Sequence, residues 1–322
     1  MLAGLAALLI LGLWYTQLPP TTRPISRPKG DIVLFQAVVE RMRAGQPYYA
    51  AMNTELRQRA YPTASVVNWR LPGTFLLVAH APRAAHFVAL TLGVIGLAGS
   101  VLLFRNAAPL LTIAAAIIQL GAAVLPAIPD DGLYMPEMWA AILLLLSVLA
   151  SAFGLVRLAV CCAIGALCAR ELILPYVLIS LGLALRGGRT LEVRWYLAGL
   201  ALFVTYYAAH AVMAHRYIVP GDYGYTTWLI FNGWRFVVST VGMGGWYLVL
   251  PTWTAAVGAV IIVASLWSPA DIHLKIIVAM YVVTFCVVGH YFNSYWGLMT
   301  GPSWGLATVY GLVGLRRLAG EA

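Results

Sequence analysis

Long apolar stretches separated by short polar turns run through almost the whole chain. Ten of them are bounded by Pro, Gly or charged residues: 2–18, 84–104, 110–128, 138–153, 155–169, 172–185, 195–214, 246–266, 272–290 and 304–315. An apolar helix needs about 20 residues to cross the hydrocarbon core of a bilayer. The pattern therefore predicts an all-α, polytopic integral membrane protein with about ten transmembrane helices.

The apolar region 155–185 is too long for a single span, so we divide it at Arg170-Glu171. Pro175 follows shortly after, and proline is favoured in the first turn of a helix. We therefore predict that one span ends just before Arg170 and that the next begins just after Glu171.

The first loop, residues 19–83, is the longest polar region and contains two amphipathic segments. After Asp31, apolar residues recur with helical spacing, and Gly45 and Pro47 end this segment. The second segment begins at Tyr48 and carries the pair Glu55/Arg59 on its polar side. We expect two helices that lie on the outer surface of the membrane.

Composition excludes an ordinary soluble protein, because 62% of the residues are hydrophobic and 10% are charged, against about 45–50% and 25% in soluble domains. We expect one membrane domain over residues 1–322. The net charge of +9 is explained by basic residues that set the membrane topology. We therefore expect membrane lipids as partners and no nucleic acid. The four cysteines lie in apolar stretches without a CxxC pair, which indicates neither a disulfide framework nor a zinc site.

Basic residues in the short turns set the expected orientation. If the N-terminus is cytoplasmic, the following all lie inside, as the positive-inside rule favours: Arg105, Arg157, Arg186, Arg189, Arg194, Lys275, Arg316 and Arg317. Both termini are then cytoplasmic and the loop 19–83 lies outside. The N-terminal stretch has no basic start and no small-residue cleavage site, so we expect it to be a retained span rather than a signal peptide.

Carboxylates on the outer side are the first candidates for chemistry. Asp31 precedes an amphipathic segment and has two interpretations: the N-cap of a helix, or a general base at the mouth of a membrane cavity. Asp130 and Asp131 occupy a Pro-Asp-Asp-Gly sequence that is typical of a turn. This pair could also hydrogen-bond a sugar or an acceptor, or hold a divalent cation.

Cations and aromatic rings on the same side are the second group. Arg170 and Glu171 interrupt an apolar region, where ionisable residues are costly and are either paired or functional. They form either a structural salt bridge or a phosphate site in which Glu171 orients Arg170. Arg216 and Arg235 are further phosphate candidates, and Trp69 and His290 are candidates for acceptor or sugar binding. The alternative for each is an interfacial belt of aromatic and basic side chains.

Three features occur together: an Asp just past the first span in KGDIVLFQ, a first loop containing RAGQPYYAA and YPTASVVNWRLPG, and the acidic pair at Asp130/Asp131. This combination resembles the GT-C superfamily of membrane glycosyltransferases, most of all its short bacterial members. The resemblance implies that Asp31 is the catalytic acid of the first loop and that Asp130/Asp131 is the second acidic motif. Arg170-Glu171 is similar to an Arg-Glu pair of bacterial relatives.

The resemblance implies an inverting transfer of a sugar from a polyprenyl-phosphate carrier to a glycan, lipid or protein acceptor, on the outer face of the bacterial inner membrane. It requires no cofactor, since the leaving phosphate can be stabilised by fixed cations, and no metal is expected. Two alternatives stay open: a transporter or flippase for a lipid-linked substrate, and a catalytically silent subunit of an envelope-polysaccharide assembly complex. A transporter would need polar groups near the bilayer midplane.

Overall fold

The computed structural model describes residues 1–18 and 30–320. Residues 19–29, which include the basic residues Arg23, Arg27 and Lys29, and residues 321–322 lie outside the described part. Over the described ranges every regular element is a helix, and the one β-type pairing is an isolated antiparallel bridge between Leu229 and Val288. The predicted all-α class is confirmed.

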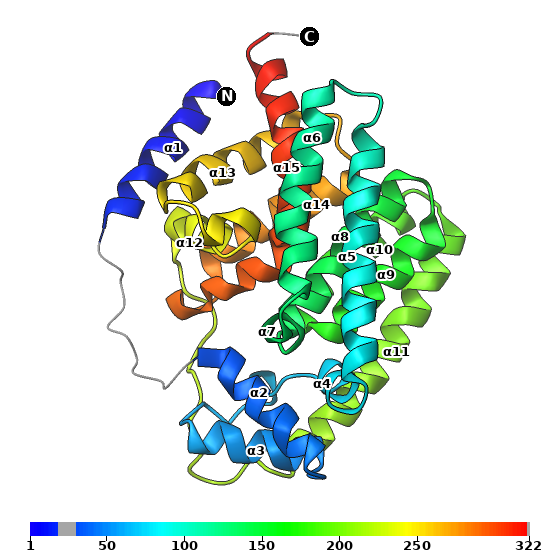
Figure 1. Ribbon diagram of the computed structural model, residues 1–322, viewed down its shortest axis with the longest axis vertical. Helices are drawn as coiled ribbons and strands as arrows, with labels where there is room; N and C mark the ends of the chain where they lie inside the picture. The colour runs from blue at the N-terminus through cyan, green and yellow to red at the C-terminus, as the bar shows by residue number, and fades with distance from the viewer. Residues whose placement is uncertain (19–29, 321–322) are drawn as a thin grey trace.

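Each of the ten predicted spans corresponds to a helix: α1 Leu2–Gln17, α5 Pro82–Phe104, α6 Pro109–Gln119, α8 Pro136–Ala152, α9 Val156–Ala169, α10 Leu174–Arg186, α11 Thr190–His215, α13 Trp253–Ala264, α14 Ile272–Val287 and α15 Gly297–Leu318. Nearly every residue of α8 is buried, and so is most of α15 up to Val309. These two helices pack against each other at the centre of the bundle. The start of α1 and the end of α15 lie at the same end of the molecule (Figure 1).

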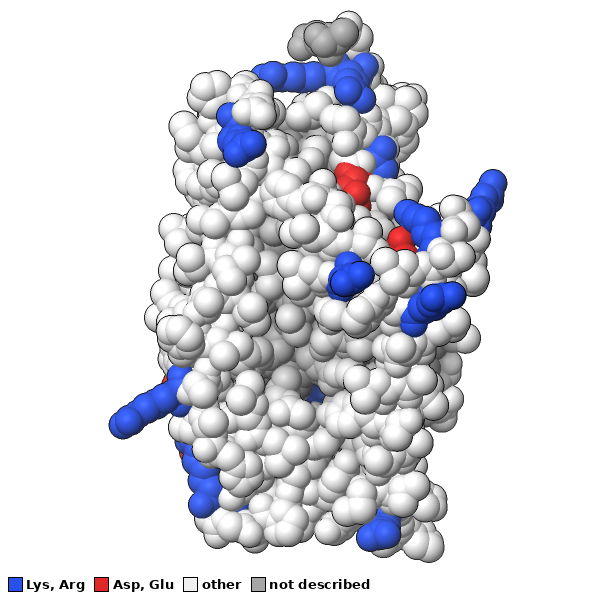
Figure 2. Space-filling view, turned by 90° about the vertical axis from the view of Figure 1, so that its right-hand side faces the viewer, with Lys and Arg blue, Asp and Glu red and all other residues white. Residues whose placement is uncertain are grey.

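Three helical segments are long and apolar enough to cross a membrane: Pro82–Phe104, Pro109–Ala127 and Thr190–His215. Shorter apolar segments cover Leu2–Gln17, Pro136–Ala152, Val156–Ala169, Trp253–Trp267 and Ile272–Val287. Only 17% of the most apolar window of α11 is buried, so its apolar side chains face outward, as expected on a lipid-facing surface. In Figure 2, Lys and Arg gather toward the two ends of the molecule, with a broad uncharged region between them.

A helical cap formed by the first loop covers the end of the bundle away from the termini (Figure 1). It consists of α2 Gly30–Arg43, α3 Tyr48–Gln58, η1 Val66–Asn68 and α4 Gly73–His80, the last of which the sequence pattern did not predict. The apolar side of α2 is buried as predicted. The polar side of α3 differs from its prediction: Glu55 is 3% exposed and pairs with Arg41 of α2 as well as with Arg59. The polar sides of the two helices therefore meet each other.

The predicted division at Arg170-Glu171 is confirmed, because α9 ends at Ala169, η4 spans Glu171–Ile173 and α10 begins at Leu174. The predicted span 246–266 is wrong at its start. A short helix, α12 (Gly233–Val241), and a 3-10 turn, η5 (Gly245–Leu248), precede α13, which begins only at Trp253. Gly245, with φ +56°, and Pro251 break the helix, although the hydrophobic pattern runs on through them.

The third span is helical but irregular. After α6, the chain forms a π-helix, η2 (Leu120–Val124), and then a 3-10 turn, η3 (Leu125–Ala127). A π-helix inserts an extra residue per turn and is frequently found at functional sites. Gly121 lies against the indole of Trp246, and a Cβ at this position would come within 2.5 Å of that ring. The distortion therefore brings η2 and η5 into close contact.

Candidate functional site

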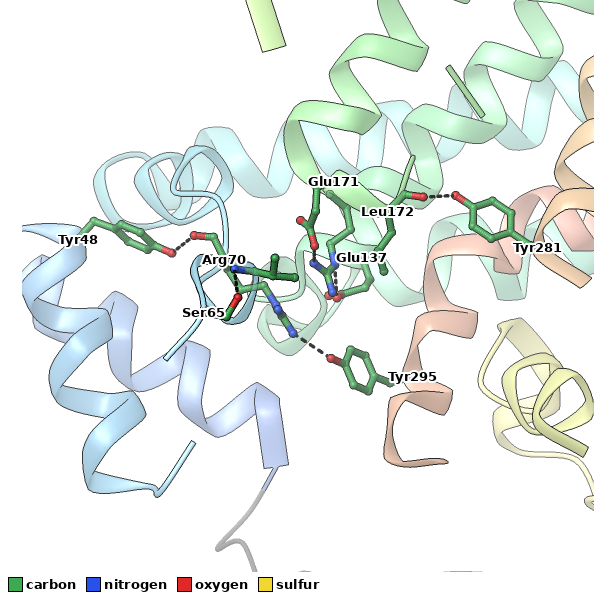
Figure 3. A network of polar contacts seen from close by, with 10 residues as sticks. Tyr48, Ser65, Arg70, Glu137, Glu171, Leu172, Tyr281 and Tyr295 are labelled. Atoms are coloured by element: carbon green, nitrogen blue, oxygen red, sulfur yellow. Dashed lines mark hydrogen bonds and ion pairs between the residues drawn. The ribbon is translucent and has the colours of Figure 1, made fainter. Parts of the chain in front are cut away.

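Four charged side chains and a tyrosine meet beneath the helical cap, and we call this group the buried charge cluster: Arg70, Glu137, Arg170, Glu171 and Tyr295. Arg170 follows the last residue of α9, and its Nε donates to Oε1 of Glu137 at 2.7 Å. A second guanidinium nitrogen of Arg170 donates to Glu171. Glu137 lies in the first turn of α8 and is completely buried. Arg170 is thus held between two carboxylates (Figure 3).

Arg70 enters the cluster from the segment between η1 and α4, and it is bonded differently. Its guanidinium donates to the hydroxyl of Tyr295 at 2.9 Å and lies 5.8 Å from the ring centre of Phe35. Its Nε is buried and has no hydrogen-bond partner, and across the described residues Arg70 makes no ion pair. Among the described residues, Arg70 therefore carries a positive charge without an ion-pair partner and an N–H group without an acceptor.

The cluster combines two guanidinium groups with two carboxylates, so its charges nearly cancel. Burial opposes ionisation of Glu171, but Arg170 and Arg70 outweigh it and hold the pKa of this carboxyl below its usual range. Burial raises the pKa of Tyr295 to about 12, so its hydroxyl stays protonated at neutral pH. Tyr295 consequently keeps its proton while it accepts the hydrogen bond from Arg70.

Asp31 lies near this cluster, because it is one helical turn before Phe35 on α2 and the guanidinium carbon of Arg70 is 5.8 Å from the ring centre of Phe35. Oδ1 accepts a hydrogen bond of 2.6 Å from the hydroxyl of Tyr61, and the residue is half-buried. The prediction that Asp31 is an N-cap is wrong: α2 begins at Gly30, which places Asp31 inside its first turn. A carboxylate in a first turn is still favoured by the helix dipole. Of the predicted residues, the structure brings Asp31, Arg170 and Glu171 to one region.

The acidic pair of the second outer loop lies elsewhere. Asp130 begins the short helix α7 (Asp130–Leu133), its side chain is 73% exposed, and Oδ1 lies 3.4 Å from Nδ1 of His86 on α5. Asp131 is exposed as well. In the described part of the chain no group of three or more His, Cys, Asp or Glu side chains is arranged to hold a metal ion. Asp130 therefore belongs to a surface pair with His86.

The remaining predicted residues occupy three different settings. Trp69 precedes Arg70 but is 2% exposed, and its Nε1 donates to the carbonyl of Thr63 at 3.3 Å, so its ring offers no open face. His290 stacks on Phe292 with 5.1 Å between ring centres, and its Nε2 has no partner. Arg216 is exposed at the end of α11, and Arg235 is half-buried in the first turn of α12.

Sequence reasoning missed Glu137 and did not single out Arg70 or Tyr295. Glu137 follows Pro136 at the start of an apolar stretch, and an ionisable residue beside such a stretch is costly unless it has a partner. The energetic cost of an unpaired Glu137 at this position could therefore have indicated that it has a buried partner. Nothing in the sequence links Arg70 to Tyr295, because the two residues are 225 positions apart.

This arrangement suits transfer chemistry on an anionic substrate. Asp31 is a half-buried carboxylate that can accept a proton, and Arg70 is a half-buried cation without an ion-pair partner in the part of the chain described. Figure 2 shows a hollow in the uncharged region of this face, with a small patch of blue inside it. Comparison with protein-family models, curated proteins and solved structures gives no match to this chain.

Proposed function

We propose that this protein is an inverting membrane glycosyltransferase that takes a sugar from a polyprenyl-phosphate carrier. The observation that carries the proposal is that Asp31 and Arg70 lie in one region. Asp31 is a half-buried carboxylate one turn before Phe35 on α2, and Arg70 is a half-buried guanidinium that lies over the Phe35 ring and whose Nε has no hydrogen-bond partner. The first provides a base for an attacking hydroxyl, and the second provides a cation for a departing phosphate. The likeness of the first loop to GT-C glycosyltransferases points the same way.

In the proposed reaction, an acceptor hydroxyl oxygen attacks the anomeric carbon of the sugar. The bond from that carbon to the phosphate oxygen breaks, and polyprenyl phosphate leaves with the bonding electrons. Asp31 takes the proton of the acceptor hydroxyl. Because the attack is a single displacement from the face opposite the phosphate, the configuration at the sugar carbon inverts. Arg70 offsets the charge that develops on phosphate, while the charge of Arg170 is taken up by Glu137 and Glu171.

We propose that all ten helices named above cross the bacterial inner membrane, with both termini in the cytoplasm and the helical cap outside. The topology is supported by the start of α1 and the end of α15, which lie at the same end of the molecule (Figure 1), and by the basic residues of the turns. The acceptor, a glycan, lipid or protein, then reaches Asp31 from the outer side.

Substitution Asp31→Asn tests the function, because the amide keeps the size of the side chain and can still accept from Tyr61. The purified protein in nanodiscs is supplied with a panel of polyprenyl-phosphate hexoses and pentoses and a membrane extract as acceptor. Release of polyprenyl phosphate is measured by mass spectrometry. We expect it to fall roughly 100-fold or more, the usual contribution of a general base.

The matched control is Glu40→Gln, which removes a carboxylate from an exposed position on the same helix. We expect it to retain wild-type turnover. Equal turnover by Asp31→Asn and wild type would show that Asp31 is not the base and would refute the assigned mechanism.

One observation favours a second candidate, a transporter. A series of buried polar groups joins α8, α10 and α14: Ser147 lies 3.1 Å from the hydroxyl of Tyr176, which lies 3.2 Å from Nδ1 of His273. Polar groups inside a bundle are what an alternating-access path requires. Uptake of a polyprenyl-phosphate sugar across proteoliposome membranes without hydrolysis or transfer, abolished in Tyr176→Phe, would favour this candidate.

A further inference from the structure

A second feature of the bundle is an apolar cavity of about 290 Å³ between α6, η2, η5, α13 and α15. Its wall includes Ile117, Ile118, Ala122, Val241, Trp246 and Trp304, together with four glycines. We call it the apolar cavity. It lies apart from the residues of the buried charge cluster, and the proposed reaction makes no use of it.

The wall of this cavity suits hydrocarbon rather than water. Two of its polar groups bond within the protein: Nε1 of Trp246 donates to the carbonyl of Ile117 at 2.6 Å, and Oγ1 of Thr308 donates to the carbonyl of Trp304 at 2.9 Å. Nε1 of Trp304 is buried and has no partner. A buried water needs two to four polar partners, whereas an apolar cavity of about 150 Å³ stays dry and takes up benzene. The present cavity has room for a larger apolar group.

The cavity opens sideways toward the lipid. Ile117 and Leu250 are wall residues, yet their side chains are 54% and 45% exposed. The neighbouring Val249, at 76% exposure, is also apolar. An apolar chain in the bilayer can therefore enter between α6 and η5 without crossing a polar surface.

Helix α15 joins the cavity to the candidate active site. Tyr295 of the charge cluster lies in η7 (Tyr291–Trp296), which leads directly into α15, and Gly301, Trp304 and Gly305 line the cavity one to three turns further along. At a rise of 1.5 Å per residue, the six to ten residues between them span roughly 10–15 Å. A phosphate at Arg70 and a hydrocarbon chain in the cavity can thus belong to one molecule.

We propose that the apolar cavity binds the first isoprene units of the lipid-linked donor, while its phosphate lies at Arg70. This inference rests on the proposed function, because it assigns the chain of the same donor. The inference goes beyond the proposed function, because it names the apolar cavity as the place where an isoprenoid chain is distinguished from the acyl chains of ordinary phospholipids.

Photolabelling in nanodiscs tests the proposal without requiring sugar transfer. The probe is geranylgeranyl phosphate with a diazirine on the isoprene unit next to the phosphate, and labelled residues are mapped by mass spectrometry. We expect labels on the cavity walls of α6, η5 and α15. Unlabelled geranylgeranyl phosphate should displace the probe, whereas phosphatidylglycerol at the same concentration should not.

Ile118→Trp fills the cavity, and Ile113→Trp makes the same change on the lipid-facing side of α6, where Ile113 is 55% exposed. We expect Ile118→Trp to reduce labelling roughly 10-fold, the effect of denying burial to about two methylene groups, and Ile113→Trp to leave it unchanged. If Ile118→Trp does not fold, the map of labelled residues in the wild type decides the question.

Labels outside the cavity, or equal displacement by phosphatidylglycerol, would overturn the proposal. If the labels lie in the cavity but no donor sugar is ever transferred, the chain-binding site stands and the glycosyltransferase function fails. If sugar is transferred but the cavity is not labelled, the glycosyltransferase function stands and the chain-binding site fails.

Discussion

Removing Glu137 is the substitution for which the structure gives the clearest energetic expectation. Glu137 is completely buried and accepts from Arg170, whose side chain is 3% exposed. Replacing Glu137 with Met leaves the buried Arg170 and the half-buried Arg70 with only Glu171 as a carboxylate of the cluster. An uncompensated buried charge costs about 3–5 kcal/mol, so we expect Glu137→Met to lower the free energy of unfolding by that amount.

A double substitution tests whether charge is the cause. In Glu137→Met/Arg170→Met the cluster keeps one guanidinium, Arg70, and one carboxylate, Glu171, so its charges balance as they do in the wild type. Replacing a buried pair by apolar side chains of similar volume is often neutral. We therefore expect the double variant to recover about 2 kcal/mol or more of the loss, although it removes more hydrogen bonds than the single variant does.

The assay is unfolding in mixed micelles with increasing SDS, followed by circular dichroism. Glu55→Gln is the contrast: Glu55 is also buried, but its partners Arg41 and Arg59 are 31% and 23% exposed, so solvent screens the pair and the cost should be about 1 kcal/mol or less. If Glu137→Met costs no more than Glu55→Gln, or if the double variant loses the sum of its single losses, the reasoning about the cluster is refuted.

Three further predictions follow from particular contacts. Hydrogen bonds from Arg57 hold the pKa of Asp222 at about 2, below the unfolded value of about 3.9. The stabilisation that the ionised Asp222 gives to the fold is therefore present above about pH 5 and is lost as pH falls toward 2. The difference in melting temperature between wild type and Asp222→Asn should shrink over that range. A difference that stays constant with pH would show that the ionisation of Asp222 does not stabilise the fold. Gly121→Ala should lower the melting temperature in detergent, because its Cβ would come within 2.5 Å of the Trp246 ring; an unchanged value would show that η2 can straighten. Arg170→Lys should reduce donor turnover as well as stability, since an ammonium group cannot reproduce the planar arrangement of donors to Glu137 and Glu171; full turnover with lowered stability would make Arg170 a packing residue only.

The helical bundle could be predicted well from the sequence. A bilayer demands long apolar helices, so hydropathy alone located the segments, and the division at Arg170-Glu171 followed from charges that an apolar span does not tolerate. The region 233–252 was predicted less well. Its apolar residues continue without a break, but Gly245 and Pro251 divide it into α12, η5 and α13.

The candidate site could be predicted only in part. Asp31, Arg170 and Glu171 stood out because each is an ionisable residue next to an apolar stretch. Arg70 looked like one of many basic residues at the interface, and its unpaired Nε depends on contacts made by distant segments. The adjacent pair Asp130/Asp131 was the more visible acidic signal, whereas the buried carboxylate in the structure is Glu137, a few residues later.

The stereochemistry of sugar transfer is a direct test of the proposed glycosyltransferase reaction. Wild-type protein, Asp31→Asn and Arg70→Gln are supplied with a polyprenyl-phosphate sugar that the wild type consumes, and the glycosylated acceptor is examined by NMR for the configuration at the anomeric carbon. Our account predicts a single product of inverted configuration from the wild type, and a loss of roughly 100-fold or more in each variant. A product of retained configuration, undiminished transfer by both variants, or a wild type that consumes none of the donors would contradict it.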